Sequence, residues 1–320
     1  MIDVMMTRMS RKQKTRADIG LLSMELYADD SCYREDTMNL SELAEEYRLN
    51  AEERLIFKEY TQNRFKDAKE NNSPDVSFLK AWDRIIAYAE MFGAEKAINS
   101  LICPNRPVAF RSPEMLEIKL YDSSAGKIPI ISVRDTEDFE QLVTNVAYKG
   151  VRPEHLSETG ASFLSNKTTR FIILSAKPYS NVPATELGLP DEAEWREKSM
   201  LLRRGHECTH YFTKQTYGIT NNILHDEIMA DFMGMLEAFG FYKAEWFLRF
   251  MGIVEGSGGR LIFYTEALPD HVRKAVAKLA ELVAYRLEAW SQTDSFRAMT
   301  PAERIQCMCR AGLEGMLQIA

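Results

Sequence analysis

The sequence lacks the long apolar segments that membrane proteins carry. No stretch approaches the roughly 18 consecutive apolar residues that a transmembrane helix requires. The basic residues within 1–16 are not followed by the apolar region of a secretory signal. We therefore expect a cytoplasmic protein that does not associate with membranes, and we interpret residues 1–16 as a solvated basic arm.

Excess positive charge and paired cysteines are also missing. Lys and Arg total 40 against 47 Asp and Glu, which gives a net charge of −7, whereas binding to nucleic-acid phosphates needs a basic surface. Nucleic acid is therefore not expected as the main partner. The cysteines are odd in number and have no disulfide-framework spacing, which favours reduced thiols in the cytoplasm. They are Cys32, Cys103, Cys208, Cys307 and Cys309.

Histidine is scarce, yet two of the 5 histidines fall in one short motif. His206 and His210 belong to the sequence HECTH, and residues at this spacing share one face of an α-helix. Their imidazoles can therefore bind one divalent ion, while the adjacent Glu207 reaches a metal-bound water. This is the H-E-x-x-H arrangement, in which two histidines bind zinc and the glutamate is the general base. The alternative is a surface helix that carries these polar residues by coincidence.

A second stretch, residues 221–231, supplies the carboxylates that such a site needs. It has the pattern of a helix, on which Glu227 and Asp231 share a face. A catalytic zinc site requires a third protein ligand and one open position for water, and Glu227 can be that ligand. Asp231 can accept the second ring N–H of a ligating histidine. Taken alone, the pair could also be a solvated acidic face.

Residues 206–231 resemble the gluzincin metallopeptidases typified by thermolysin. The resemblance rests on HECTH and on the segment DEIMAD at 226–231, which is similar to the glutamate-x-x-x-aspartate helix of those enzymes. It implies zinc on His206, His210 and Glu227, with Glu207 as the base and Asp231 as the partner of a ligating histidine. It also implies a β-rich lobe and a helical lobe on either side of the zinc, with an extended substrate paired to a sheet edge.

The pattern of apolar residues predicts a mostly helical α+β fold. Helices are expected at 40–47, 51–60 and from Ser73 to Gly93, and a hairpin at 116–121 and 128–133. A helix capped by Asp135, an inner strand at 171–174 and a helix from Asp191 to Gly218 follow. Further helices carry Trp246, Val272 and, after a capping box at Thr300, the end of the chain.

This order predicts how the chain is divided. We expect an N-terminal helical region at 1–105 and a zincin-like metallopeptidase domain at 106–320. Within that domain, a sheet lobe at 106–180 precedes a helical zinc-binding lobe at 190–320. A helix-turn-helix character at 40–57 keeps a DNA-binding regulator open as an alternative, although Arg48 stands where such motifs prefer glycine.

Two single residues and one short segment lead to further structural predictions. Pro129 lacks a backbone N–H, which favours an edge or strand-start position. Thr159–Phe163 is interpreted as a surface loop, with a sheet edge that pairs with substrate as the alternative. Gly205, inside the long helix and next to His206, suggests that another backbone approaches closely there.

The predicted activity is hydrolysis of a peptide bond in a peptide or protein substrate, through a zinc-activated water and Glu207. The tetrahedral oxyanion also needs a hydrogen-bond donor, and we expect it among Tyr217, His225 and His271, with Tyr211 and Tyr264 as further possibilities. His225 could instead be a ligand. A zinc-binding protein without catalytic activity remains an alternative class.

Overall fold

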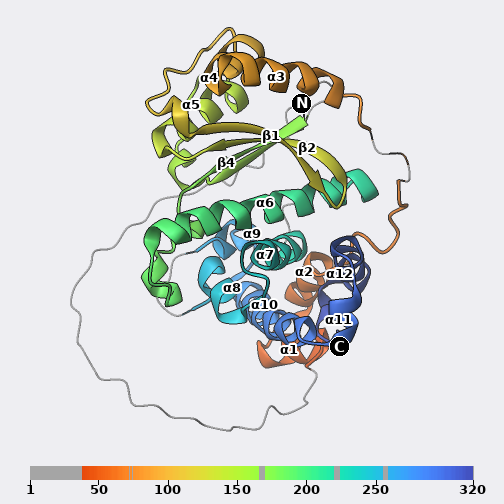
Figure 1. Cartoon of the computed structure of the whole chain (residues 1–320). Coiled ribbons are helices and arrows are strands. Elements are labelled where there is room, and N and C mark those ends of the chain that lie inside the picture. Colours follow the sequence, from red (N-terminus) through yellow and green to blue (C-terminus); the bar gives the residue numbers. More distant parts are fainter. Residues whose placement is uncertain are drawn as a thin grey trace, which may run out of the picture.

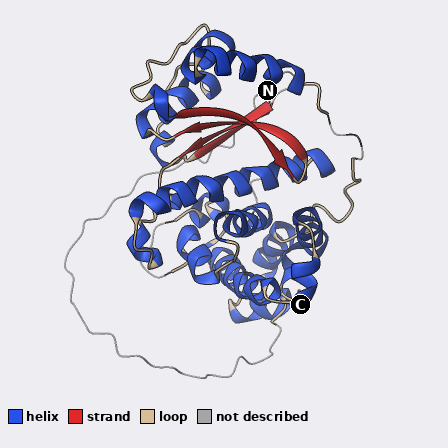
Figure 2. Ribbon diagram, viewed as in Figure 1, coloured by secondary structure: helices blue, strands red, loops and turns tan. Residues whose placement is uncertain are grey.

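The computed structural model of the chain describes residues 38–71, 73, 75–165, 170–219, 224–254 and 259–319. It consists of three layers, in which a small sheet lies between one group of helices and the long helix α6, with the remaining helices beyond α6 (Figure 1). The fold is α+β and mostly helical, as predicted (Figure 2). The expected basic arm at 1–16 and Cys32 lie outside the described residues.

The sheet has four strands in the order β1-β2-β4-β3. The strands are β1 (Leu116–Ser123), β2 (Gly126–Val133), β3 (Ala161–Ser165) and β4 (Arg170–Ser175). β1 and β2 form the predicted antiparallel hairpin, β2 and β4 are parallel, and β4 and β3 are antiparallel. β4 is the predicted inner strand, and its Phe171–Leu174 segment is buried on both sides.

The structure corrects two predictions about this sheet. β2 is an inner strand, so Pro129 is not at an edge of the sheet. The pairing of β2 with β4 begins one residue later, at Ile130 and Ile172, so the missing N–H of Pro129 interrupts no hydrogen bond to β4. Thr159–Phe163 is not simply a surface loop, because residues from Ala161 onward form the edge strand β3.

The outer face of the sheet is covered by α3 (Leu79–Phe92), α4 (Ala94–Ala97), the π-helical turn η1 (Ile98–Ile102) and α5 (Thr136–Ala147). Asp135 caps α5 as predicted. α3 ends at Gly93 as predicted but begins at Leu79 rather than near Ser73. Asp75 accepts hydrogen bonds from the amide and hydroxyl of Ser77, so the chain turns once more before the helix starts.

The inner face of the sheet packs on α6 (Glu192–Tyr217), which separates it from a helical lobe. That lobe contains α7 (Leu224–Phe239), α8 (Ala244–Met251), α9 (Leu261–Thr265), α10 (Asp270–Ser291), α11 (Asp294–Ala298) and α12 (Pro301–Met316). Thr300 and Glu303 form the predicted capping box of α12. Short 3-10 turns at Pro113–Met115, Leu156–Glu158, Tyr179–Asn181 and Ala184–Leu187 connect the elements.

Residues before 105 do not form a region of their own, which corrects the predicted division of the chain. α1 (Leu40–Glu46) and α2 (Ala51–Tyr60) bury Leu43 and Phe57 in the core of the helical lobe. α3 buries Trp82 and Ile85 in the second core, which is formed around the sheet. Each amphipathic helix covers the nearest apolar surface, so the N-terminal helices are shared between the two lobes.

Within the described residues, no helix has both the length and the apolar character needed to cross a membrane.

Candidate metal centre

The site forms where α6 and α7 cross in close contact. Asp191 caps the start of α6, and Gly218 ends it in a left-handed conformation, as predicted. At the crossing, a Cβ on Gly205 would lie 2.8 Å from the Cα of Gly234. Gly205 therefore permits the close backbone approach that the sequence suggests, and it brings the buried faces of the two helices together.

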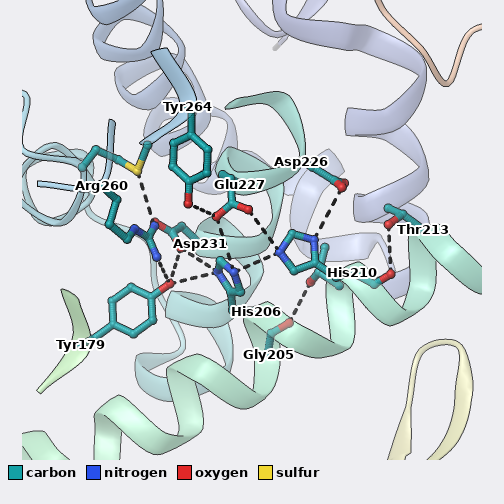
Figure 3. Close-up of polar contacts among 12 residues, drawn as sticks. Tyr179, Gly205, His206, His210, Thr213, Asp226, Glu227, Asp231, Arg260 and Tyr264 are labelled. Carbon is teal, nitrogen blue, oxygen red and sulfur yellow. Dashed lines mark hydrogen bonds and ion pairs between the residues drawn. The ribbon is translucent and has the colours of Figure 1, made fainter. Parts of the chain in front are cut away.

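Three potential metal ligands converge at this crossing. His206 and His210 project from α6 and Glu227 from α7, and all three are buried (Figure 3). The Nε2 atoms of the two imidazoles are 3.0 Å apart. The two carboxylate oxygens of Glu227 lie 3.7 Å from His206 Nε2 and 3.6 Å from His210 Nε2. The three residues can offer one ligand atom each within 4.8 Å of one another.

These separations fit a small divalent cation. Ligands at about 2.0–2.1 Å from a tetrahedral zinc lie roughly 3.3 Å from each other. At the crossing the two Nε2 atoms are 3.0 Å apart, and the carboxylate of Glu227 approaches them at 3.7 Å through Oε2 and at 3.6 Å through Oε1. Two imidazole nitrogens and a carboxylate oxygen form a donor set that zinc and other first-row metals accept. The residues therefore fit a metal ion in both chemistry and arrangement.

The other ring nitrogen of His206 is held by a buried network. Its Nδ1 lies 2.8 Å from Asp231 Oδ1 and 3.0 Å from the hydroxyl of Tyr179. The same carboxylate accepts hydrogen bonds from Tyr179 and from Arg260, and Arg260 Nη1 also donates to the Tyr179 hydroxyl at 2.8 Å. These cationic and polar partners outweigh burial, so the pKa of Asp231 is lowered. An ionised Asp231 fixes the His206 ring with Nε2 directed towards His210 and Glu227.

His210 has a carboxylate on its outer side as well. Its Nδ1 lies 3.6 Å from Asp226 Oδ2. Burial would lower the pKa of His210, but Asp226, Glu227 and Glu207 outweigh it and raise the pKa to about 9. The raised pKa reports a concentration of negative charge around the histidines, which also favours a divalent cation in the place of a proton.

Glu207 lies on the side of α6 that faces an open cleft. Its carboxylate is almost buried, and Oε2 has no hydrogen-bond partner within the described residues. A buried carboxylate oxygen without a partner is costly. Oε2 of Glu207 is therefore placed to accept a hydrogen bond from a water or a substrate in the cleft.

The cleft has a volume of about 180 Å³ and joins the two lobes. On the sheet side it is lined by residues 158–163, which include the start of the edge strand β3. On the helical side it is lined by Arg260, Phe263 and Tyr264. The Tyr264 hydroxyl donates to Glu227 Oε2 at 2.8 Å, so this phenol reaches the metal position itself (Figure 3).

The structure does not bring Tyr217, His225 or His271 to the cleft, whereas Tyr264, a further possibility considered from the sequence, lines it. The Tyr217 hydroxyl reaches Glu70 at 3.4 Å. His225 points to the opposite side of α7, where its Nε2 lies 3.1 Å from the carbonyl of Met308, so it is not a ligand either. The side chain of His271 is 60% exposed near Glu53. Tyr211, also considered, donates to the carbonyl of Lys127.

Sequence reasoning missed Tyr179, Arg260 and Asp226 as parts of the site. Tyr179 and Arg260 come from loops that are distant in sequence from both motifs, and no local periodicity marks them. Asp226 directly precedes Glu227, and that adjacency is a signal that could have been used, because i and i+1 on a helix can face two neighbouring partners.

The fold and the site define an α+β protein with a buried histidine, histidine and glutamate cluster between two lobes. The chain belongs to the DUF7005 family, a family of unknown function, whose model matches residues 100–168 and 167–319. No curated protein and no solved structure matches the chain.

Proposed function

We propose that the chain is a zinc-dependent metallopeptidase. The observation that carries the proposal is the convergence of His206, His210 and Glu227 beside an open cleft into which Glu207 faces. The resemblance of residues 206–231 to the gluzincins supports the same assignment. Two imidazoles and one carboxylate leave a fourth position open in a tetrahedral site, as catalytic zinc requires.

The chain's own residues supply the proton transfers. When bound, zinc would lower the pKa of a coordinated water towards 7 and polarise the substrate carbonyl. Glu207 would accept a proton from the attacking water at its unpartnered Oε2 and deliver it to the leaving amine. Asp231 would keep the Nδ1 proton on His206, so that Nε2 stays available as a ligand.

Among the oxyanion donors considered from the sequence, Tyr264 is the one that the geometry of the cleft supports. It lines the cleft, and its hydroxyl is 2.8 Å from a ligand oxygen of Glu227. Burial and the charge of Glu227 raise the pKa of this phenol well above its ordinary value, so it remains a donor at neutral pH. We propose that it donates to the carbonyl oxygen as negative charge develops there.

The edge strand β3 supports a peptide as the substrate. Its start lines the cleft, and among the strands that the structure describes it pairs with β4 and lies at the edge of the sheet. An extended peptide can add to such an edge through main-chain hydrogen bonds. The proposal includes a cytoplasmic location, on the basis of an odd number of cysteines without disulfide-framework spacing.

Glu207→Gln tests the proposal. The zinc-loaded protein should cleave a mixture of unfolded proteins or peptides, and the variant should bind zinc normally but lose at least about 100-fold in rate. Glu194→Gln, at an exposed position of the same helix, is the matched control and should keep full activity. Hydrolysis that persists in Glu207→Gln contradicts the proposal. Stoichiometric zinc with no hydrolysis of any substrate would instead favour a metal-binding protein without catalysis.

A further inference from the structure

Arg203 is a buried cation at the end of the cleft. It lies on α6 one turn before Glu207, lines the cleft and is only 5% exposed. Its guanidinium lies over the ring of Tyr179, at 5.4 Å from the ring centroid. The same guanidinium touches the backbone where β3 begins, because a Cβ on Gly160 would come within 2.2 Å of Arg203 Nε.

Among the described residues, Arg203 makes no hydrogen bond or ion pair to a carboxylate. The charge of Glu207, one turn further along α6, acts on it without a direct contact. Nη1 donates to the carbonyls of Ser175 and Lys177, and Nη2 donates to the carbonyl of Pro178 at 3.0 Å. The cations near it are all paired: Arg260 with Asp231, Arg204 with Glu237, and Lys177 with Glu140.

An unpaired buried charge carries a large desolvation cost, and buried charges are normally paired or bind a ligand. Burial lowers the pKa of Arg203 to about 10, so the group is still a cation at neutral pH. A cation that is buried, charged and unpaired at the wall of a cleft is suited to an anion that arrives with the substrate.

We propose that Arg203 selects substrates that carry a carboxylate just beyond the scissile bond on its carboxyl side. The carboxylate would be that of an Asp or Glu side chain or of the peptide C-terminus. This inference rests on the proposed peptidase function and adds a substrate class to it.

The orientation of α6 and β3 predicts the direction in which a substrate peptide would run through the cleft. Gly160 is against Arg203, whereas Phe163 lies further along α6, with its ring 6.1 Å from that of Tyr211. β3 therefore runs in the same direction as α6. Because antiparallel pairing is the commoner mode at a sheet edge, a substrate on β3 would run from the Tyr211 end to the Arg203 end. Residues after the scissile bond, which lies at Glu207, then face Arg203.

The other charged groups of the cleft do not take over this role. Arg260 is held by Asp231 and Tyr179. The carboxylate of Glu158 lies 3.8 Å from His155 Nδ1 rather than at Arg203. Arg203 is thus the cleft cation whose charge is left for a ligand.

Matched peptides that differ only in Glu or Gln after the cleaved bond test the inference. Wild-type protein should cleave the Glu peptide with a kcat/KM roughly 10- to 100-fold higher, as expected for a charge-assisted hydrogen bond. Arg203→Met should abolish this ratio, and Arg203→Lys should keep part of it, because a lysine retains the charge but not the planar donor geometry. Arg204→Met is the matched control, because Arg204 pairs with Glu237 on another side of α6, and it should leave the ratio unchanged.

Binding gives a second readout that does not depend on turnover. Zinc-loaded Glu207→Gln should bind the Glu peptide more tightly than the Gln peptide by isothermal titration calorimetry, and this preference should disappear when Arg203→Met is added. A further pair of peptides, which end at the Gln after the bond and carry either a free or an amidated C-terminus, separates the two sources of the carboxylate. Preference only for the free C-terminus would identify a carboxypeptidase-like use of Arg203.

The outcomes separate this inference from the function on which it rests. Absence of all hydrolysis by the zinc-loaded wild type would remove the peptidase proposal and this inference with it. Hydrolysis with equal rates for the Glu and Gln peptides would overturn the inference alone, and so would an unchanged ratio in Arg203→Met. If Arg203→Met does not fold, the wild-type ratio and its reduction in Arg203→Lys decide the question.

Discussion

Gly205 of α6 and Gly234 of α7 meet without side chains between them. A Cβ on Gly205 would lie 2.8 Å from the Cα of Gly234, and a Cβ on Gly234 would lie 2.5 Å from the carbonyl oxygen of Leu202. Both contacts are with backbone atoms, which cannot move aside as a side chain can. The close crossing sets the separation between the histidines of α6 and Glu227 of α7.

Replacement of either glycine by alanine should therefore damage the metal site. We expect Gly205→Ala and Gly234→Ala to cost about 1–3 kcal/mol in unfolding free energy through overpacking and to weaken zinc binding. Gly315→Ala in α12 is the contrast, because a Cβ there meets only the Cβ of Ala311 at 3.1 Å. Denaturation curves and zinc titrations measure both effects. Normal zinc affinity in Gly205→Ala would show that the crossing does not set the ligand geometry.

The network behind His206 should tune metal affinity. Asp231→Asn and Tyr179→Phe each remove a partner of His206 Nδ1 or of the carboxylate that fixes it. Loss of such outer partners typically lowers metal affinity by about 10- to 100-fold. Competition with a zinc chelator measures the change. Because the two residues share one network, the double variant should lose less than the product of the single effects, and independent effects would contradict this account.

Tyr264 and Tyr217 give a paired test of the oxyanion donor. Tyr264→Phe removes a hydroxyl that lies beside Glu227 in the cleft, and we expect kcat to fall by about 100-fold with zinc retained. Tyr217→Phe removes a hydroxyl that reaches Glu70 instead, so kcat should stay close to that of the wild type. Equal effects of the two substitutions would remove Tyr264 from the proposed mechanism.

Acid sensitivity is expected from Glu140, which pairs with Lys177 and Arg152 beside the cleft. Burial would raise the pKa of Glu140, but hydrogen bonds from Lys177 and Arg152 outweigh it and lower the pKa below the usual 4.5. A carboxyl with a lowered folded-state pKa stabilises the fold above its unfolded pKa. That stability is lost as the pH falls through the folded-state pKa.

Glu140→Gln should accordingly cost roughly 3 kcal/mol at pH 7, because it leaves Lys177 buried and unpaired. The difference from wild type should shrink as the pH falls below about 4.5, where the carboxyl of the unfolded chain becomes protonated, and should vanish below the lowered folded-state pKa. Glu137→Gln, on the same helix, breaks only an exposed pair with Arg111 and should cost less than about 1 kcal/mol. Urea denaturation at pH 7 and pH 4 measures these values, and a difference independent of pH would refute the argument.

Local patterns were sufficient for most of the helices and strands and for the three residues that could hold a metal. The spacing of His206 and His210 is a property of one helix, and Glu227 lies on the next helix along the chain. Caps at Asn50, Asp135 and Thr300 are likewise satisfied within a single turn. Helix caps and ligand spacings of this kind depend on residues no more than about four positions apart, and a local sequence pattern can predict them for that reason.

Features that depend on tertiary packing could not be predicted in this way. Tyr179 and Arg260 meet Asp231 across 52 and 29 residues of sequence, and nothing in their own segments marks them. The packing of whole helices sets three positions that a local pattern cannot report: the half-buried position of Tyr217, the exposed position of His271 and the rotation of His225 to the far side of α7. The division of the first helices between two cores has the same origin, because an amphipathic stripe does not specify which core it joins.

Metal content, measured by elemental analysis of purified wild-type protein alongside His210→Ala, tests the central claim most directly. The geometry of His206, His210 and Glu227 predicts about one zinc per chain in the wild type, and the loss of one of three ligands should abolish it in the variant. Circular dichroism of both proteins checks that the fold persists. No metal in the wild type after zinc is supplied and the excess removed, or equal metal in both proteins, would contradict a zinc site at the crossing of α6 and α7.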